Sequence, residues 1–410
     1  MSFVAVAWLA IELVPAADAG PWVGAAVAAY TMPGIAGALL LGRRLRRVPA
    51  RRLLLTDTTV RAVFLGAIPL TWLTGALTPP LYIALLAASS VLHAWGSAGT
   101  YTLLAELLPA GRRLAANTLL STVNFAATIA GPAIAGVTVT YVSAAAVLGL
   151  DALTYAFLAA LVVRTTPRAT GPAADTAADT AADTAAPVDR TAARGGFTLL
   201  RAHPELLGLL ALTWLFNLLY GPVEVALPLH VTGDLHAPGT VLGAYWMLFG
   251  IGAVTGGLAA GALRRLPLWP VTIGIVLAWG LSLLPFGLHV PAAVTIASFT
   301  LGGAVYGPFV ALSVTLMQQT SPPRHLTAML AARSAALLTA APLGTALGGP
   351  LTAALGPRVT LAGSGLLTVA LGAAACAILA ARRVGRRARS SGIEKRPPPG
   401  AHSVTTMERR

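Results

Sequence analysis

The dominant feature of this chain is a series of long apolar stretches, each bounded by proline, glycine or charged residues. A helix needs about 20 consecutive apolar residues to cross a hydrocarbon core of about 30 Å. The stretches of this kind are residues 1–17, 22–42, 53–77, 80–107, 114–138, 141–163, 205–230, 239–263, 268–288, 290–317, 325–354 and 358–381. The sequence therefore predicts an all-α integral membrane protein with twelve transmembrane helices.

Composition supports this prediction and excludes a soluble fold. Hydrophobic residues make up 56% of the 410 residues, charged residues make up 10%, and the mean hydropathy is +0.76. The first stretch is short, because only about 14 apolar residues precede Pro15 and extend over roughly 21 Å. Either the first helix is stunted or the sequence lacks its beginning.

A polar segment divides the chain into two sets of six stretches. Residues 173–184 are three consecutive Ala-Ala-Asp-Thr units, which have no apolar face to bury and are typical of a flexible linker. Residues 197–203 are expected to form a short surface helix. The predicted organisation is an N-terminal bundle over 1–164, a cytoplasmic linker over 165–203, a C-terminal bundle over 204–382 and a basic, disordered cytoplasmic tail over 383–410.

The distribution of basic residues sets the orientation. With the N-terminus in the cytoplasm, all but three of the 28 Lys and Arg residues fall in cytoplasmic loops or the tail. The exceptions are Arg61 and Arg333, within stretches, and Arg358, in a loop on the other side. This bias explains a pI near 11.2 without nucleic acid as a partner. We expect a multi-pass protein of the cell membrane, with both termini cytoplasmic and the tail along the lipid surface.

Small residues and prolines recur at matching places in the two halves. Residues 37–45 and 256–267 both end an apolar stretch with glycines followed by paired arginines. Residues 130–136 and 341–350 both combine glycine with proline in the fifth stretch of their half. Small residues let helices approach closely and proline bends them, so these clusters predict helix packing sites at equivalent positions.

Over roughly residues 1–382 the chain resembles the major facilitator superfamily, and within it the exporters of the enterobactin and macrolide-efflux type. The motifs that carry the resemblance are Gly42–Arg52, Asp57–Arg61, Glu106–Pro109, Ala116–Leu120, Gly131–Pro132 and Leu150–Ala152. The resemblance implies two pseudo-symmetric six-helix bundles around a midplane site, working by alternating access. It also implies that Gly131, Pro132 and Gly136 belong to the antiporter motif of drug exporters.

The chain departs from the family pattern in its cytoplasmic loop. Arg46 stands where an acidic residue is usual, and Pro49 stands where glycine or aspartate is usual. The fourth stretch also lacks the arginine that many proton-coupled members carry, with His93 the nearest polar residue. Proton coupling is therefore expected by analogy with the family alone.

Glu224 is the main candidate for the transport pathway. Apart from Glu205 at the very start of its stretch, it is the only acid within an apolar stretch of the second half, and Tyr220, Asn217 and Trp214 precede it at helical spacing. The resemblance places the seventh helix beside the central cavity, so these four residues would form one polar and aromatic stripe. A single hydrogen bond between helices is the alternative role for Glu224. A charged group within a membrane normally faces a partner or a watery cavity.

Other polar residues are weaker candidates. Arg333 either faces the cavity or extends toward the cytoplasmic surface. Asn124, Tyr245, Trp246 and Tyr306 could line the cavity, although tyrosine and tryptophan also favour membrane interfaces.

Four charged residues of the first half are interpreted as structural or gating groups. Asp57 and Arg61 are four residues apart on one helix face and are expected to pair with each other. Asp151 lies in a helix that the resemblance makes peripheral. Glu106 is expected to pair with arginines of the adjacent loops.

The sequence holds no catalytic, cofactor-binding or metal-binding motif. We therefore predict that the chain is no enzyme and takes neither cofactor nor metal. The function predicted is export of an amphipathic small molecule, resembling an antibiotic or siderophore, by a monomer that exchanges it for protons. The alternatives are import of a small solute on the same fold, or a membrane assembly or sensing subunit that transports nothing.

Overall fold

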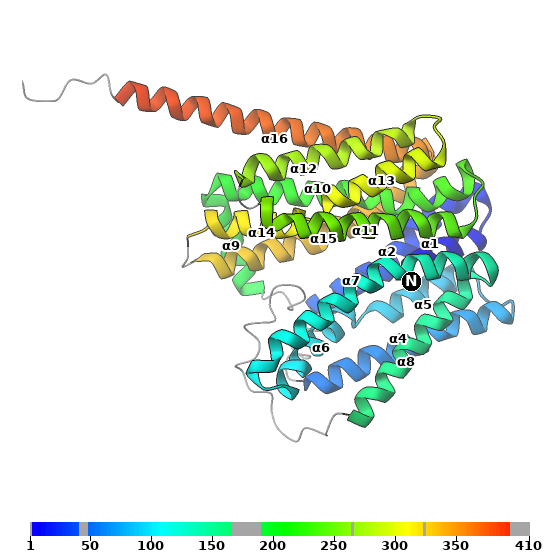
Figure 1. Ribbon diagram of the computed structural model, residues 1–410. Coiled ribbons are helices and arrows are strands. Elements are labelled where there is room, and N and C mark those ends of the chain that lie inside the picture. The colour runs from blue at the N-terminus through cyan, green and yellow to red at the C-terminus, as the bar shows by residue number, and fades with distance from the viewer. Residues whose placement is uncertain (1, 41–47, 166–189, 264–265, 323–324, 394–410) are drawn as a thin grey trace, which may run out of the picture.

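The computed structural model describes the chain apart from residues 1, 41–47, 166–189, 264–265, 323–324 and 394–410. The described residues form helices throughout the predicted stretches (Figure 1). The first half contains α1 (Ser2–Glu12), a 3₁₀ turn (Ala16–Asp18), α2 (Ala19–Leu40), α4 (Ala50–Leu73), α5 (Pro79–Ser90), α6 (His93–Leu107), α7 (Ala110–Tyr141) and α8 (Ala144–Thr165).

The second half begins after a separate helix, α9 (Arg190–Ala202). It contains α10 (Pro204–Leu229), a π-helical turn (His230–Asp234), α11 (Gly239–Leu263), α12 (Leu268–Leu283), a 3₁₀ turn (Leu284–Gly287), α13 (Ala292–Tyr306), α14 (Phe309–Thr320), α15 (Leu326–Leu355) and α16 (Pro357–Ile393). The break between α13 and α14 falls at Gly307 and Pro308. Proline lacks the backbone N–H that would continue the helical hydrogen bonds.

The described part of the chain contains ten helical segments that are long and apolar enough to cross a membrane. The other two predicted spans coincide with α1, which has 11 residues, and α2, which has 22. The protein is therefore an all-helical, multi-pass membrane protein. The number of twelve spans stays a prediction.

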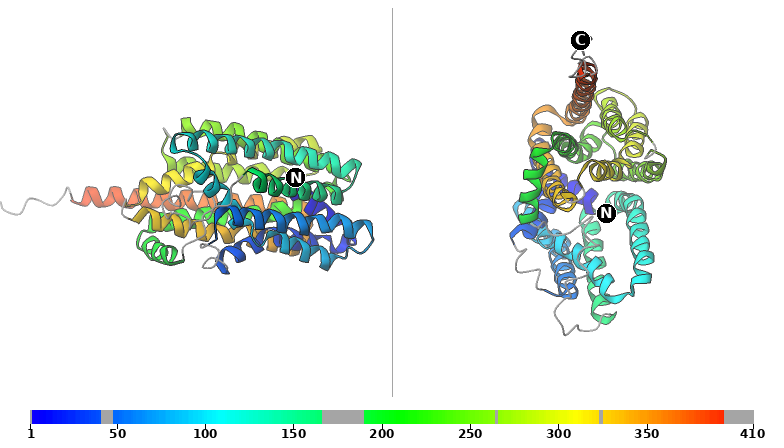
Figure 2. Two further views of the ribbon diagram at one scale, coloured as in Figure 1. Left: turned by 90° about the horizontal axis from the view of Figure 1, so that it is seen from below. Right: turned by 90° about the vertical axis from the view of Figure 1, so that its left-hand side faces the viewer.

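The helices separate into two groups that follow the order of the chain. α1 to α8 pack among themselves in one group, and α10 to α16 pack among themselves in the other (Figures 1 and 2). Between the groups, the main contacts are those of α7 with α11 and of α2 with α15. Figure 1 shows the groups meeting around α1 and α2 and diverging toward α6, α9 and α14.

Glycines hold the two groups together at one end. A Cβ atom added to Gly243, near the start of α11, would lie 2.7 Å from the carbonyl oxygen of Pro132 and 3.0 Å from the Cα of Gly136. On the other seam, a Cβ atom on Gly24 of α2 would lie 2.9 Å from the Cα of Gly349. Such close approach needs small residues, because any side chain would separate the helices. We call these two contacts the glycine seams.

The segments flanking the bundles lie only partly within the described residues. α9 begins at Arg190, before the predicted start of a surface helix at residue 197, and packs on α15. The Ala-Ala-Asp-Thr units lie outside the described residues. α16 continues to Ile393, beyond the predicted boundary at residue 382, and the tail after it is also outside them.

Candidate functional site

A cavity of about 550 Å³ lies between the two groups of helices. Its walls come from α1, α7, α10 and α11, two helices from each half. The residues that line it are Phe3, Val4, Asn124, Ala127, Thr128, Pro132, Tyr220, Glu224, Trp246 and Phe249. Among these residues Glu224 is the only charged one, and the aromatic rings outnumber the other polar groups.

Close packing of α10 against α15 fixes the position of Glu224. A Cβ atom on Gly221, one turn before Glu224, would collide with the backbone of Gly344 in α15. This contact brings Thr345 opposite Glu224, and the Thr345 hydroxyl donates a hydrogen bond of 3.2 Å to Glu224 Oε2. Glu224 therefore both lines the cavity and joins two helices, which combines its two predicted roles.

Aromatic rings pack behind and around the carboxylate. Tyr220 lies 5.5 Å from Trp279 and 5.6 Å from Tyr306, measured between ring centroids. Across the cavity, Phe3 of α1 meets Trp246 of α11 edge to face at 5.5 Å. These rings make the cavity wall apolar except at Glu224 and the short polar side chains of α7.

The predicted stripe on α10 is only partly on the cavity wall. Tyr220 and Glu224 line the cavity, whereas Asn217 and Trp214 do not. The Asn217 side chain donates to the backbone oxygen of Thr213 at 2.8 Å. Trp214 Nε1 donates to Thr339 of α15 at 3.1 Å, so it connects helices.

Two predicted tyrosines lie behind the cavity instead of on its wall. Tyr245 is fully buried, and its hydroxyl lies 2.6 Å from Thr295 Oγ1 within the second half. Tyr306 stacks on Phe216 at 5.9 Å as well as on Tyr220. Both tyrosines contribute to the aromatic core that supports the wall.

Arg333 does not line the cavity. It is buried in α15, and its Nη2 donates to Ser313 of α14 at 2.9 Å. Its Nε has no hydrogen-bond partner within the described residues. The structure therefore places this cation inside the second half, away from Glu224.

The predicted α7 residues lie along the interface between the halves. Asn124 and Pro132 line the cavity, while Gly131 is buried beside Pro132. Gly136, one turn further on, packs against Gly243 at the glycine seam. Pro132 therefore lies on the cavity wall, and Gly136 lies at the seam where the two halves meet.

The remaining predicted residues lie in the first half, away from the cavity. Asp57 and Arg61 are buried and their charged groups are 3.3 Å apart, and Asp151 accepts a hydrogen bond from Ser2. Glu106 is exposed near the end of α6. Its expected partners include the loop arginines at 43–47, which lie outside the described residues.

Several lining residues were missed by the sequence analysis. They are Phe3, Val4, Ala127, Thr128 and Phe249, together with Thr345 behind Glu224. A local signal exists on α7, where Asn124, Ala127 and Thr128 are three and four residues apart and form one face of small and polar groups. No local pattern identifies Phe3 or Thr345, because their positions depend on contacts with distant helices.

Two bundles of membrane helices around a shared polar and aromatic cavity define the architecture of a secondary transporter. The sequence model of the Major Facilitator Superfamily matches residues 1–288. The chain therefore belongs to the major facilitator superfamily of membrane transporters.

Individual relatives agree with this assignment. The chain is 29% identical over 329 residues to the uncharacterized MFS-type transporter y4rN of Sinorhizobium fredii, covering 78% of this chain and 77% of that protein. The fold is similar to that of nucleoside transporter NupG, with a TM-score of 0.63, 14% identity and coverage of 92% and 97% of the two chains. It is also similar to a D-xylose-proton symporter, with a TM-score of 0.65, 15% identity and coverage of 91% and 92%.

Proposed function

We propose that the protein is a proton-coupled exporter of an amphipathic small molecule, located in the cell membrane with both termini in the cytoplasm. The observation that carries this proposal is the position of Glu224, the single carboxylate on a cavity wall that is mainly aromatic and apolar, with short polar side chains on α7. Aromatic walls favour the apolar part of a ligand, and one charged group orients its polar part. This chemistry supports an amphipathic substrate over a sugar-like one.

The two glycine seams support alternating access. Both lie at the end of the molecule where α2 and α11 begin and where α7 and α15 end. The positive-inside rule assigns the opposite end, which carries the basic loops, to the cytoplasm. The structure then corresponds to a state closed on the outside, in which substrate enters from the cytoplasm.

The energetics allow coupling to protons. One proton moving through about 100 mV gains about 2.3 kcal/mol, and one unit of pH gradient adds about 1.4 kcal/mol. A hundredfold outward gradient of a neutral substrate needs about 2.8 kcal/mol. One proton per substrate is therefore sufficient, and Glu224 is the proposed site where proton and substrate compete.

The test compares accumulation of amphipathic antibiotics in cells with the wild-type protein, Glu224→Gln and no protein, with and without a protonophore. We expect the wild type to lower accumulation about tenfold or more, and the protonophore or Glu224→Gln to abolish most of this effect. Asp18→Asn is the matched control, because Asp18 is exposed in the turn before α2 and lies outside the cavity, and it should export normally. Export that continues unchanged in Glu224→Gln would remove this residue from the mechanism.

Import of a small solute is the second candidate. It is supported by the likeness to the D-xylose-proton symporter, which shares the fold. Vesicles of known orientation with an imposed pH gradient separate the two directions. Substrate that moves in the same direction as the protons would establish import. Substrate that moves in the opposite direction would establish export.

A further inference from the structure

Thr345 of α15 is a buried polar residue directly behind Glu224. It is 1% exposed, and its hydroxyl oxygen has two acceptors within reach. One is Glu224 Oε2 at 3.2 Å, and the other is the backbone oxygen of Ala341, one turn earlier in the same helix, at 2.9 Å. A hydroxyl carries a single hydrogen, so it donates fully to one of the two acceptors at a time. The two contacts therefore compete for the same hydrogen.

The Ala341 oxygen stays paired whichever way the Thr345 hydrogen points. Within α15, the backbone N–H of Thr345 donates to the oxygen four residues earlier, which is that of Ala341. The hydroxyl bond is therefore an additional one for this oxygen. The Thr345 hydroxyl can turn toward Glu224 without leaving a buried backbone group unpaired.

The two protonation forms of Glu224 use this contact in opposite directions. An ionised carboxylate can only accept, so the Thr345 hydrogen points to Glu224 Oε2. A protonated carboxyl group carries its own hydrogen, which it can donate to Thr345 Oγ1 while the Thr345 hydrogen points to Ala341. Each form leaves every polar atom of the contact paired, which is what a buried site requires.

No other side chain of the described residues shares this position. The side-chain hydrogen bond that reaches Glu224 comes from Thr345, and the titratable groups that interact with Glu224 are Tyr220 and Tyr306. Both are phenols, which stay neutral at physiological pH. Charged groups on other elements that pack on α10 bond elsewhere: Arg333 with Ser313, Asp234 with His230 and Arg358, and Glu12 with Trp8. Among the described residues, the charge on Glu224 is therefore met by the Thr345 hydroxyl.

Thr345 and Glu224 belong to the same half of the molecule. Besides the contact of Gly221 with Gly344, a Cβ atom on Gly348 of α15 would lie 2.9 Å from the Cα of Pro222 in α10. The two helices are thus packed backbone to backbone on both sides of the Glu224–Thr345 contact. When the halves rock against each other, the pair moves as a unit. Glu224 then keeps the same partner whichever side of the membrane the cavity faces.

We propose that Thr345 is a positioning residue for Glu224, which reverses the direction of one hydrogen bond each time the acid gains or loses its proton. The proton binds to and leaves from a carboxylate oxygen, and the hydrogen of Thr345 only changes its acceptor. This inference rests on the proposed function, in which proton and substrate compete at Glu224, and names the group that stabilises both forms of the acid. A proton-coupled carrier passes through both forms in every cycle.

Removal of the hydroxyl should change how tightly Glu224 holds its proton. Thr345→Val keeps the branched shape of the side chain and loses the hydroxyl. The ionised acid then loses a charge-assisted hydrogen bond, and the protonated acid loses a neutral one, which is about half as strong. The protonated form is therefore favoured, and Glu224 should bind its proton about tenfold more tightly.

The test follows protonation directly and needs no substrate. Infrared difference spectra of the purified protein in lipid bilayers, recorded as the pH is lowered, detect the carbonyl band of a protonated carboxylic acid. The band of Glu224 is the one that is absent in Glu224→Gln. In Thr345→Val this band should reach half its height about one pH unit higher and at a changed frequency, because the acid has lost its acceptor.

Two variants control for changes in packing. Thr345→Ser keeps the hydroxyl and should titrate like the parent protein. Thr352→Val removes a hydroxyl from the same helix, where Thr352 is 4% exposed and donates to the Gly348 oxygen at 2.7 Å, and it should also titrate like the parent. Thr345→Ala removes the same hydroxyl with a smaller side chain and should reproduce the shift if Thr345→Val folds poorly.

The outcomes separate this inference from the proposed function. A Glu224 band that titrates at the parent pH in both Thr345→Val and Thr345→Ala would overturn the role of Thr345 and leave Glu224 as the proton site. A shift of equal size in Thr352→Val would also overturn it, since the effect would then come from general loosening of α15. The absence of any band that depends on Glu224 would overturn both proposals.

Discussion

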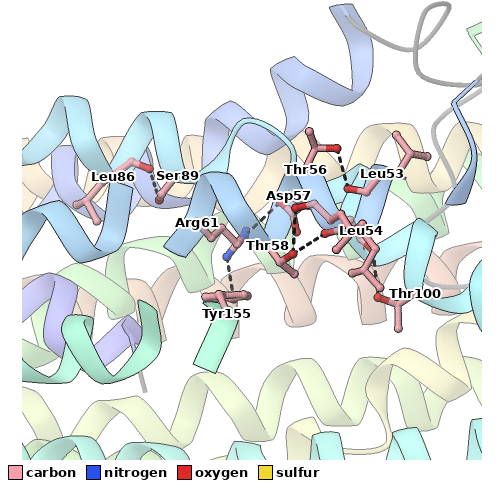
Figure 3. A network of polar contacts seen from close by, with 12 residues as sticks. Leu53, Leu54, Thr56, Asp57, Thr58, Arg61, Leu86, Ser89, Thr100 and Tyr155 are labelled. Carbon is pink, nitrogen blue, oxygen red and sulfur yellow. Dashed lines mark hydrogen bonds and ion pairs between the residues drawn. The ribbon is translucent and has the colours of Figure 1, made fainter. Parts of the chain in front are cut away.

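The two halves of the molecule share a helical architecture but have interiors of different chemistry. The first half buries the pair Asp57–Arg61 and links it to Tyr155 through hydrogen bonds. The second half buries a group of aromatic rings around Trp279 and Phe299, which are 5.9 Å apart. The comparison shows a buried ion pair within the packing of the first half (Figure 3) and an aromatic core behind the cavity wall in the second half.

The two interiors also respond differently to change. Ring contacts depend on shape and depend little on pH, and each aromatic pair contributes about 0.5 to 1.5 kcal/mol beyond its burial. A buried ion pair contributes little by itself, but removing one partner leaves an uncompensated charge. Substitutions in the two halves should therefore differ in both size and pH dependence.

Trp279→Ala should have the largest effect on stability. Trp279 is fully buried and contacts the rings of Tyr220, Phe249, Phe299 and Tyr306. Removing so large a side chain leaves a cavity, and we expect a loss of about 4 kcal/mol in the free energy of unfolding. Circular dichroism recorded during a titration with denaturing detergent measures this loss of unfolding free energy. The loss should be the same at neutral and acidic pH.

Arg61→Met should cost about 3 kcal/mol at neutral pH. Without the guanidinium, the buried Asp57 lacks its cation, and protonation at acidic pH neutralises it. The destabilisation should therefore decrease as the pH falls, unlike that of Trp279→Ala. The same titration at two pH values measures this, with the exposed Arg112→Met as the control. Equal pH dependence in the two halves would contradict the contrast between them.

Gly243→Val tests the contact where the halves meet. The added side chain would press on Pro132 and Gly136, and overpacking of this kind costs about 1 to 3 kcal/mol. Because only the state closed at this seam contains the contact, the variant should populate the other state. Labelling of Ala127→Cys in a Cys376→Ser background reports access to the cavity. Gly274→Val, where the added Cβ meets nothing within 4 Å, should label like the parent.

The helices were predictable from the sequence because each depends on the apolar content of one continuous stretch. Glu224 could be assigned to the cavity wall for two reasons together: an acid in a membrane stretch needs a polar environment, and the family resemblance places the seventh helix beside the cavity. Asn217 and Trp214 were placed on that wall by periodicity alone, and the structure gives them other contacts.

The contacts between distant helices could not be predicted. Ser2 and Asp151 are 149 residues apart, and Thr345 and Glu224 are 121 residues apart. Each contact depends on the register of two helices, which is set by the close approach of small residues such as Gly221 and Gly344. A local pattern indicates that such residues pack against something, and it does not identify the partner.

The smallest expected effect comes from making the same substitution in both halves. Tyr245→Phe removes a hydroxyl whose partner, Thr295, also donates to the backbone oxygen of Ala292 at 2.9 Å, so the loss should be about 1 kcal/mol. Tyr155→Phe removes an acceptor from Arg61, a buried cation, and should cost about 2 kcal/mol. Unfolding in detergent measures the free energy of unfolding of each variant relative to that of the parent protein. The two substitutions remove the same atom, so a larger loss of unfolding free energy in Tyr155→Phe would come from the charge of its partner, Arg61. Equal losses would show that the buried charge of the first half is not sensitive to its hydrogen bonds.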